Sequence, residues 1–381
     1  MAIIDSDQHL YETRTLWRDH IDPQLRDEAL RIEDDAVGTP RLRWRAQDIG
    51  IAEVQVPGRT AEIGEHHRRA RQGLPPRERY DEVLPRDYWE PAARLAKLAD
   101  LGVDEAVLFP NYGLLWERTL HAALPALLAN MAAWNRWCVT VAQEGRGRLH
   151  PVAHLTLRDP AWLEAQLDAL GKAGVRLAMI APALVDGRPL SHPAHDRMWA
   201  AFCAHGVSPV FHVAEQPRPF ADAWYTDAGV AFVPALGAVF IHVAAALGCS
   251  DLILNGTFER FPDLRLGIVE LSAVWVPLYL MMLDGGTAFI QQINGETSRL
   301  PLRPSDYFRR QVRVSSFAYE APANIVHQLG GIDLLMCCSD YPHSEGTSMP
   351  LADYAAGGLD AASGAAPGLF SDNIAFLLRK S

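Results

Sequence analysis

The 381-residue sequence predicts an α/β fold, a closed (β/α)8 barrel, from two observations. Short apolar runs rich in β-branched residues alternate with longer segments of helical periodicity, and there are eight such runs. Strands that alternate with helices indicate parallel βαβ units, and eight units close a barrel. The hydrophobic content of 49% is ample for one large core, so we expect a single domain over residues 1–381.

The predicted strands are short, and most of them are followed by a helical pattern. The strands are Ala2–Ile4, Val103–Phe109, His150–Leu155, Val175–Ile180, Val207–Val213, Leu264–Val269, Val312–Ser316 and Ile332–Cys338. The helices are Pro91–Leu101, Thr119–Gln143, Pro160–Lys172, Ala194–His205, Pro234–Leu254, Val274–Asp284, Ala321–Leu329 and a final Asp372–Arg379.

Residues 26–89 do not fit this alternation, because they hold charges, Pro and Gly with only weak periodicity. A stretch of this length inside a compact domain is usually functional or has structure of its own. Since it follows the first strand directly, it leaves from the end of the barrel where that strand ends. We therefore expect a cap insertion that covers the barrel mouth and shapes substrate choice.

Composition and charge exclude several classes of function. The net charge of −11, without a basic stripe, argues against a nucleic-acid partner. We find no signal peptide and no unbroken apolar run of about 18–20 residues, so we expect no membrane partner. The 5 cysteines lack zinc-ribbon spacing and suggest reduced thiols in a cytoplasmic enzyme. Neither a Gly-rich phosphate loop nor a GxSxG nucleophile motif is present.

Four predicted strands end in residues that can bind a metal ion. Such a histidine is often only packed, and such an aspartate often only turns the chain, but the coincidence at four strand ends is informative. In barrels of this kind these ends meet at the catalytic face, where unpaired buried carboxylates are costly and a divalent cation removes that cost. Nitrogen and carboxylate ligands together suit Zn²⁺, Mn²⁺ or Fe²⁺ better than Ca²⁺. The residues are Asp7 and His9, His212 with Glu215, Glu270, and Asp340 with His343.

Aromatic side chains are frequent in the segments expected at the mouth. An apolar cavity with a few polar anchors is typical of a small-molecule site, although several of these rings could simply belong to the core. We expect a small apolar or aromatic substrate there, with the pocket formed by Tyr112, Trp116, Phe220, Trp224, Tyr225, Trp275 and Tyr341.

Four motifs together resemble the amidohydrolase-related family over nearly the whole chain. They are DSDQH, PVFHVAE, NGTFERFPDLRLGIVE and CSDYPHSEG. This branch of the amidohydrolase superfamily includes the aminocarboxymuconate semialdehyde, γ-resorcylate and carboxyvanillate decarboxylases. The resemblance implies a distorted (β/α)8 TIM-like barrel with a divalent metal at its mouth, held by Asp7, His9, His212 and Asp340.

The sequence departs from that family pattern in two places. The decarboxylases usually carry a histidine at the end of strand six, where this chain has Glu270. Dinuclear members use a carboxylated lysine on strand four, but none of the lysines here (Lys97, Lys172 and Lys380) stands at a strand end. Glu270 could therefore act as a base beside metal-bound water or bridge two metals, with His242 reaching the second. A packed histidine at a helix start remains the other interpretation of His242.

Three functions stay open at this point. The first is a metal-dependent hydrolase or decarboxylase of a small carboxylate-bearing compound, with Glu270, Asp340 or His343 moving protons. The second is a non-heme diiron monooxygenase that hydroxylates an apolar substrate, as in some relatives, with two Fe ions as cofactor. The third is an inactive barrel that serves as a binding protein. Relatives are often dimers, so a homodimer is an expected assembly.

Overall fold

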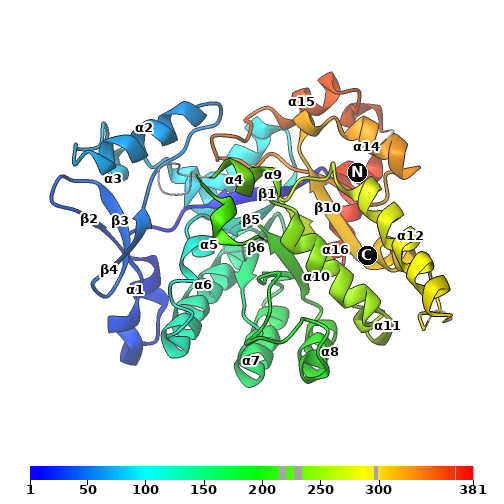
Figure 1. Cartoon of the computed structure of the whole chain (residues 1–381). Coiled ribbons are helices and arrows are strands. Elements are labelled where there is room, and N and C mark those ends of the chain that lie inside the picture. Colours follow the sequence, from blue (N-terminus) through cyan, green and yellow to red (C-terminus); the bar gives the residue numbers. More distant parts are fainter. Residues whose placement is uncertain (214–219, 227–233, 296–298, 365, 381) are drawn as a thin grey trace.

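Eight parallel strands and their surrounding helices form a nearly closed barrel in the computed structural model (Figure 1), which confirms the predicted fold class. The structure describes residues 1–213, 220–226, 234–295, 299–364 and 366–380, so Glu215 lies outside the described residues. The strands follow one another in chain order, and a bridge between Gln8 and Tyr341 joins the first to the last. They are β1 (Ile4–Leu10), β5 (Glu105–Pro110), β6 (Leu149–His154), β7 (Leu177–Met179), β8 (Ser208–His212), β9 (Leu266–Val269), β10 (Val312–Ser316) and β11 (Leu335–Cys337).

The helices begin and end with residues that suit those positions. Proline stands in the first turn of α4 and α7, and glycines in the left-handed conformation, Gly102 (φ 74°) and Gly206 (φ 64°), end α4 and α8. The main helices are α4 (Pro91–Leu101), α6 (Leu124–Glu144), α7 (Pro160–Lys172), α8 (Asp196–His205), α10 (Val243–Leu254), α12 (Val276–Asn294), α13 (Pro304–Gln311) and α14 (Pro322–Leu329). Shorter ones are α1 (Leu16–His20), α5 (Gly113–Trp116), α9 (Ala235–Val239), α11 (Thr257–Arg260), α15 (Pro350–Ala356) and α16 (Asn373–Leu377).

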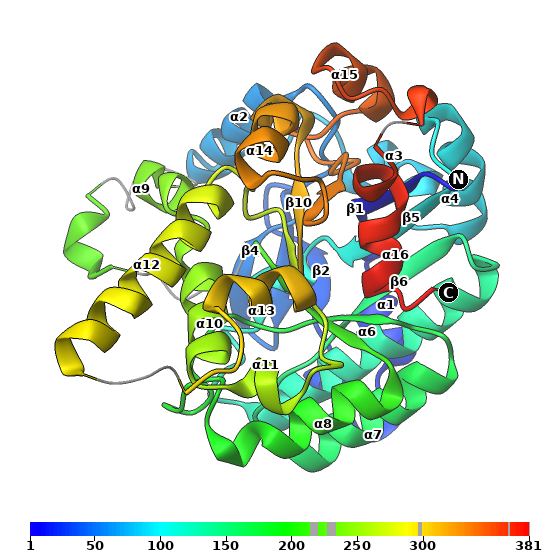
Figure 2. The same ribbon diagram turned by 90° about the vertical axis from the view of Figure 1, so that its right-hand side faces the viewer.

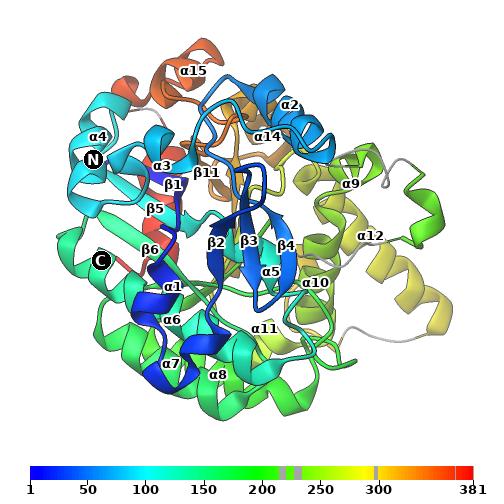
Figure 3. The same cartoon turned by 90° about the vertical axis from the view of Figure 1, so that its left-hand side faces the viewer.

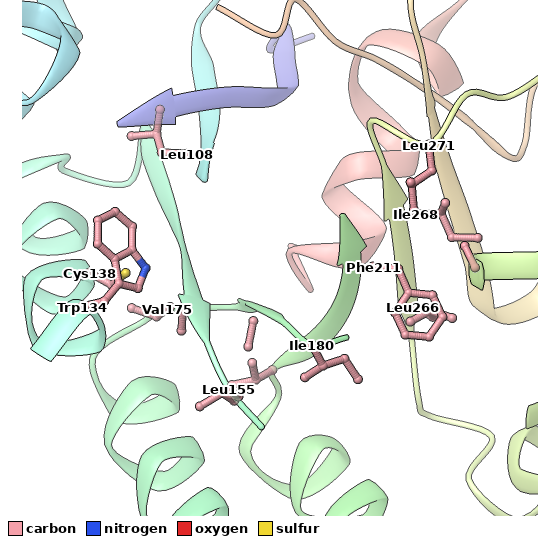
Figure 4. Close-up of a cluster of buried hydrophobic side chains, with 14 of the residues drawn as sticks. Leu108, Trp134, Cys138, Leu155, Val175, Ile180, Phe211, Leu266, Ile268 and Leu271 are labelled. Atoms are coloured by element: carbon pink, nitrogen blue, oxygen red, sulfur yellow. The ribbon is translucent and has the colours of Figure 1, made fainter. Parts of the chain in front are cut away.

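The core has two layers that meet at the strands. The outer layer fills the space between strands and helices, where Leu155, Ile180, Phe211 and Ile268 lie (Figure 4). The inner layer fills the barrel itself with alternate strand residues, which is the usual arrangement in barrels of this size. Its members are Ile4, Val107, Phe109, Val152, Leu177, Met179, Val210, Val269 and Met336, with Ile374, Leu377 and Leu378 from the C-terminal helix region.

The segment of residues 26–89 contains a small antiparallel sheet and two helices beside the barrel (Figure 3). Its strands are β2 (Arg31–Asp34), β3 (Pro40–Trp44) and β4 (Gln47–Ile51), and its helices are α2 (Thr60–Arg71) and α3 (Tyr80–Val83). Ser344 N–H donates to Gln55 Oε1 at 3.0 Å, and Gly58 N–H donates to the Ser344 carbonyl at 2.9 Å. These bonds attach the segment to the loop after β11, at the carboxyl end of the strands.

One segment has the length and composition of a membrane span. Ala235–Leu254 comprises 20 residues of mean hydropathy 1.8, and one third of its most apolar window is buried (33%). It contains two helices, α9 and α10, in place of the single predicted helix over Pro234–Leu254. Cys249, Leu252 and Ile253 of α10 are buried in the outer core layer. Core helices commonly meet the same criterion, so the segment is weak evidence for a span.

Candidate metal centre

Strand β1 is buried along its whole length although most of its side chains are polar. Asp5 accepts hydrogen bonds from Gln8 Nε2 at 2.8 Å and from the Ser339 amide at 3.0 Å, and so ties β1 to the chain after β11. Burial raises the pKa of Asp5 to about 6. Protein donors thus occupy the Asp5 carboxylate. Asp7, two residues later, differs because its Oδ2 atom has no hydrogen-bond partner.

A buried arginine supports β1 from behind. Arg94 of α4 donates to Gln8 Oε1 at 3.0 Å and to the carbonyls of His9 and Asp87 at 2.8 Å each. Tyr341 O–H donates to Asp87 Oδ2 at 2.7 Å. Burial lowers the pKa of the guanidinium, and these acceptors satisfy its donors. Arg94 thus fixes the backbone of His9 relative to the residues after β11.

The predicted ligands from β1, β8, β9 and β11 come together at one point. His212 Nε2 lies 3.4 Å from Asp7 Oδ1 and 3.2 Å from Glu270 Oε2. His9 Nε2 lies 3.2 Å from Asp340 Oδ1, 3.5 Å from Asp7 Oδ1 and 3.7 Å from Glu270 Oε2. Four strands therefore bring two imidazoles and three carboxylates together, and His9 and Glu270 contact both sides of the cluster.

The two imidazoles are oriented as metal-binding histidines are. His9 Nδ1 lies 3.2 Å from the carbonyl oxygen of Pro110, and His212 Nδ1 lies 3.0 Å from the carbonyl oxygen of the next residue, Val213. A carbonyl only accepts, so each Nδ1 carries a proton and each Nε2 presents its lone pair to the cluster when the ring is neutral. This backbone support fixes the tautomer that a metal ion needs.

The cluster leaves several buried polar atoms without a hydrogen-bond partner. They are Asp7 Oδ2, His9 Nε2, Glu270 Oε2, and both Asp340 oxygens, Oδ1 and Oδ2. Such atoms are rare in folded proteins, and together they indicate a binding site for an ion or a catalytic role. Two overlapping ligand groups have suitable spacing: Asp7, His9, His212 and Glu270 form one, and His9, Glu270, Asp340 and His343 form the other. The donor set fits a divalent cation of the Mn²⁺, Fe²⁺ or Zn²⁺ kind.

Backbone geometry directs two of the carboxylates into the cluster. Glu270 and Asp340 have φ values of 55° and 54°, a left-handed conformation that is uncommon outside glycine. The amide of Glu270 donates to Ser315 Oγ of β10 at 2.9 Å, which holds the chain where β9 ends. Outliers of this kind concentrate at functional sites, where surrounding structure maintains them.

The close contacts shift the pKa values of the cluster. Burial, followed by the charge of Asp340, raises the pKa of Glu270 to about 7. Burial alone would lower the pKa of His9, but the Asp340, Asp7 and Glu270 carboxylates raise it well above its usual value. Burial alone would raise the pKa of Asp340, but His343 and His9 hold it well below its usual range. Glu270 is thus the carboxyl group that exchanges a proton near neutral pH.

His343 connects the cluster to a neighbouring amide. Its Nδ1 lies 2.9 Å from Asp340 Oδ1, its Nε2 lies 2.7 Å from Asn111 Oδ1, and its ring stacks on His9 at 3.8 Å between centroids. Burial alone would lower the pKa of His343, but Asp340 raises it. Both ring nitrogens face oxygen acceptors, which favours a protonated imidazole beside Asp340.

The structure places other predicted residues away from the cluster. His242 begins α10, stacks on Trp275 at 5.5 Å and belongs to neither ligand group, so its role as a ligand stays a prediction. Trp224 is 70% exposed, and Phe220 packs on Phe240. The remaining predicted pocket residues are buried, namely Tyr112, Trp116, Tyr225, Trp275 and Tyr341.

Arg94 and His154 are two buried polar residues that sequence patterns did not single out. Arg94 lies on a helix, where a charged residue is normally expected on the outside. His154 ends β6 as His212 ends β8, and a signal was present in HPVAHL, where a histidine closes an apolar strand. The Nε2 atom of His154 lies 3.0 Å from Glu117 Oε2.

Comparisons with known proteins bear on the family and the fold of the chain. The family model described as Amidohydrolase matches residues 4–380. An amidohydrolase from Mycobacterium avium subsp. paratuberculosis K-10 has a TM-score of 0.76 and 21% identity over 99% of each chain. A 5-carboxyvanillate decarboxylase from Novosphingobium aromaticivorans DSM 12444, solved with bound manganese, has a TM-score of 0.66 and 18% identity over 99% of this chain and 97% of that one. A 2,6-dihydroxybenzoate decarboxylase from Rhizobium has a TM-score of 0.61 and 14% identity over 100% and 99%. No curated protein matches the sequence.

Proposed function

The chain belongs to the amidohydrolase family, and from this membership we propose that it is a metal-dependent decarboxylase of a small apolar or aromatic carboxylate. The observation that carries the proposal is the buried cluster of Asp7, His9, His212, Glu270 and Asp340 at the carboxyl ends of the strands. The decarboxylases among the structural neighbours support it as analogy of fold.

Asp7, His9 and His212 would hold one divalent cation, with Asp340 beside His9 as a further ligand or as the group that orients water. The cation supplies a Lewis acid that polarises an oxygen of the substrate and offsets the charge of the buried carboxylates. Three carboxylates with imidazoles favour a hard or borderline ion such as Mn²⁺, Fe²⁺ or Zn²⁺. Manganese in one structural neighbour is consistent with this choice.

Glu270 would act as the proton donor. As the bond between the substrate carbon and its carboxylate breaks, the bonding electron pair takes the proton of the Glu270 carboxyl group, and CO₂ leaves. Burial and the neighbouring charge of Asp340 raise the pKa of Glu270, which favours the protonated form that a general acid needs. His343, held between Asp340 and Asn111, would keep the Asp340 carboxylate in its charged form.

Burial of the site favours loss of CO₂ over attack by water. Asp7, His9 and Asp340 have side chains with 0% exposure, and that of Glu270 has 11%. Excluding water weakens the solvation of a substrate carboxylate, whose charge disperses as CO₂ departs. Hydrolysis with Glu270 as base is the competing reaction within the same site.

The dinuclear oxygenase remains a second candidate for one specific reason. His9 and Glu270 belong to both ligand groups, so Glu270 has the position of a bridging ligand. In that arrangement two Fe ions would occupy the site, and turnover would consume O₂.

The segment of residues 26–89 would act as the cap of this site, since it attaches to the loop after β11. With Tyr112, Trp116, Tyr225, Trp275 and Tyr341 it would shape the substrate pocket.

The 5 cysteines of the chain form no disulfide, which supports a cytoplasmic location.

Metal content and gas exchange test the proposal. Protein purified aerobically and anaerobically should contain about one metal per chain, and a panel of aromatic and unsaturated carboxylates should yield CO₂ without O₂ uptake.

Glu270→Gln should keep the metal and slow turnover by about 10²–10⁴-fold, the usual effect of losing a general acid or base. His212→Ala should lose the metal. Two irons per chain with O₂ uptake would favour the oxygenase, and water-dependent cleavage without CO₂ would favour the hydrolase.

A further inference from the structure

A second polar pair lies at the barrel mouth, on β6. His154 is the last residue of this strand and aligns with Met179 of β7, whose side chain belongs to the inner core layer, as does that of Val152 two residues before it. Because alternate strand residues share a face and aligned residues of parallel strands point the same way, His154 points toward the barrel axis at its catalytic end.

The orientation of His154 is fixed on three sides. Its amide donates to Asn135 Oδ1 at 2.8 Å, and Asn135 Nδ2 donates to its carbonyl at 3.1 Å. Its Nε2 lies 3.0 Å from Glu117 Oε2, and its ring packs against Trp116 at 5.1 Å between centroids. An ionised Glu117 only accepts, so the Nε2 atom carries the proton and the Nδ1 atom of a neutral ring is an acceptor.

Both neighbouring rings leave a buried polar atom unused. His154 Nδ1 and Trp116 Nε1 have no hydrogen-bond partner, and the two residues are 1% and 0% exposed. Five histidines are buried in the described part of the chain, and only His9 and His154 have such an unpartnered ring nitrogen. That of His9 faces the metal cluster. A histidine with a purely structural role would be expected to use both nitrogens within the protein.

We propose that Trp116 and His154 form a subsite for a hydroxyl group of the substrate. The indole N–H donates to the hydroxyl oxygen, and the hydroxyl proton is donated to His154 Nδ1. One unused donor and one unused acceptor on two rings in contact match the two hydrogen-bonding functions of a hydroxyl group. Glu117 is the positioning residue that fixes the imidazole tautomer. The inference rests on the proposed function, because the hydroxyl group is assumed to belong to the carboxylate substrate of the proposed decarboxylase.

Calorimetric binding to the manganese-loaded protein tests the subsite, with benzoate and its 3- and 4-hydroxy derivatives as probes. The wild type should bind at least one hydroxybenzoate about tenfold more tightly than benzoate, the scale of one well-made buried hydrogen bond. Trp116→Phe and His154→Phe should each remove this preference and leave the metal content unchanged. Variants that retain the preference would overturn the proposal.

Thermal unfolding separates a subsite from a structural pair. His154→Phe loses the contact between Nε2 and Glu117 at 3.0 Å, and the matched control His195→Phe loses the contact between Nδ1 and the Leu190 carbonyl at 3.3 Å, so both melting temperatures should fall. A subsite adds a difference in the presence of the hydroxybenzoate that binds the wild type: its ligand-induced rise in melting temperature should be lost in His154→Phe and kept in His195→Phe. A rise that persists in His154→Phe would overturn the subsite. If none of the benzoates binds the wild type, the proposed substrate class fails and the subsite fails with it, whereas binding without the hydroxyl preference overturns the subsite alone.

Discussion

Asp340 combines two functions in one side chain, since it faces the metal cluster and an imidazole at the same time. Its Oδ1 lies 2.9 Å from His343 Nδ1 and 3.2 Å from His9 Nε2. We expect Asp340→Asn to retain part of the metal, because the amide oxygen still coordinates. Turnover should fall by about 10²–10⁴-fold, because the charge that holds the protonated His343 is lost.

Metal analysis together with steady-state kinetics checks this prediction. Asp333→Asn provides a control, because Asp333 is an exposed carboxylate just before β11. Near-normal turnover of Asp340→Asn would mean that the residue only shapes the turn after the strand.

For single residues, the sequence was informative about the candidate site where a polar residue follows an apolar strand. Asp7, His9, His212, Glu270 and Asp340 were identified in this way, and the structure brings them together. Distances between strands are not contained in the sequence, so the sequence could not show that His343 joins a ligand group while His242 belongs to neither. It also could not show that Ser339 and Gln8 would donate to Asp5 while Asp7 Oδ2 stays without a hydrogen-bond partner.

At the scale of structural elements, the backbone path of the loop after β11 requires a glycine at position 346. A Cβ atom on Gly346 would lie 2.5 Å from the Asp340 carbonyl oxygen and 2.6 Å from that of Ser339. Gly346→Ala must therefore move the backbone that carries Asp340. We expect destabilisation of about 1–3 kcal/mol, the usual range for an overpacked site, together with weaker metal binding.

Chemical denaturation and metal titration measure these two effects. Gly286→Ala is the matched control, because a Cβ there meets nothing within 4 Å and lies in a helix, α12, where alanine is favoured. Its stability should stay equal or rise. Unchanged metal affinity in Gly346→Ala would show that the loop adjusts without moving Asp340.

Elements with a clear apolar pattern were predicted well, and polar elements were not. The predicted β10 coincides with the observed Val312–Ser316, whereas the first strand was predicted at Ala2–Ile4 and is observed at Ile4–Leu10, so the two share one residue. Most of the observed strand consists of buried polar residues, so hydrophobic periodicity ends where the strand begins. The sheet β2–β3–β4 escaped detection because its residues are charged and only partly buried.

The whole molecule exposes an apolar face along α12, which runs beside α9 and α10 (Figure 2). Six side chains of α12 are each more than half exposed, namely Leu278, Met281, Met282, Phe289, Ile290 and Ile293, and Leu247 of α10 adds to them. Monomers rarely expose so large an apolar patch. The helix has no Lys or Arg, and the chain carries a net charge of −11, which disfavours a lipid surface. A second copy of the chain, related by twofold symmetry, suits an uncharged face of this size.

We therefore expect light scattering to give twice the chain mass of 42.1 kDa. The double variant Met282→Glu with Phe289→Glu should be monomeric, because it places charges in the centre of the face. Leu184→Glu is the control, since Leu184 is 64% exposed elsewhere and should leave the mass unchanged. A monomeric wild type at micromolar concentration would contradict the prediction.

The closure of the barrel has a consequence for how the protein is made. Asp7 and Asp340 belong to overlapping ligand groups although 333 positions separate them (340 − 7), and α16, still later in the chain, supplies Ile374 and Leu377 to the inner core. At ordinary rates of translation, the ribosome needs roughly 20–70 s to synthesise the chain between those two carboxylates. The nascent chain therefore carries the first residues of the cluster long before their partners exist. The cluster is complete only after Asp340 has been made, so we expect the free metal pool of the cell at that moment to determine which ion the cluster takes up.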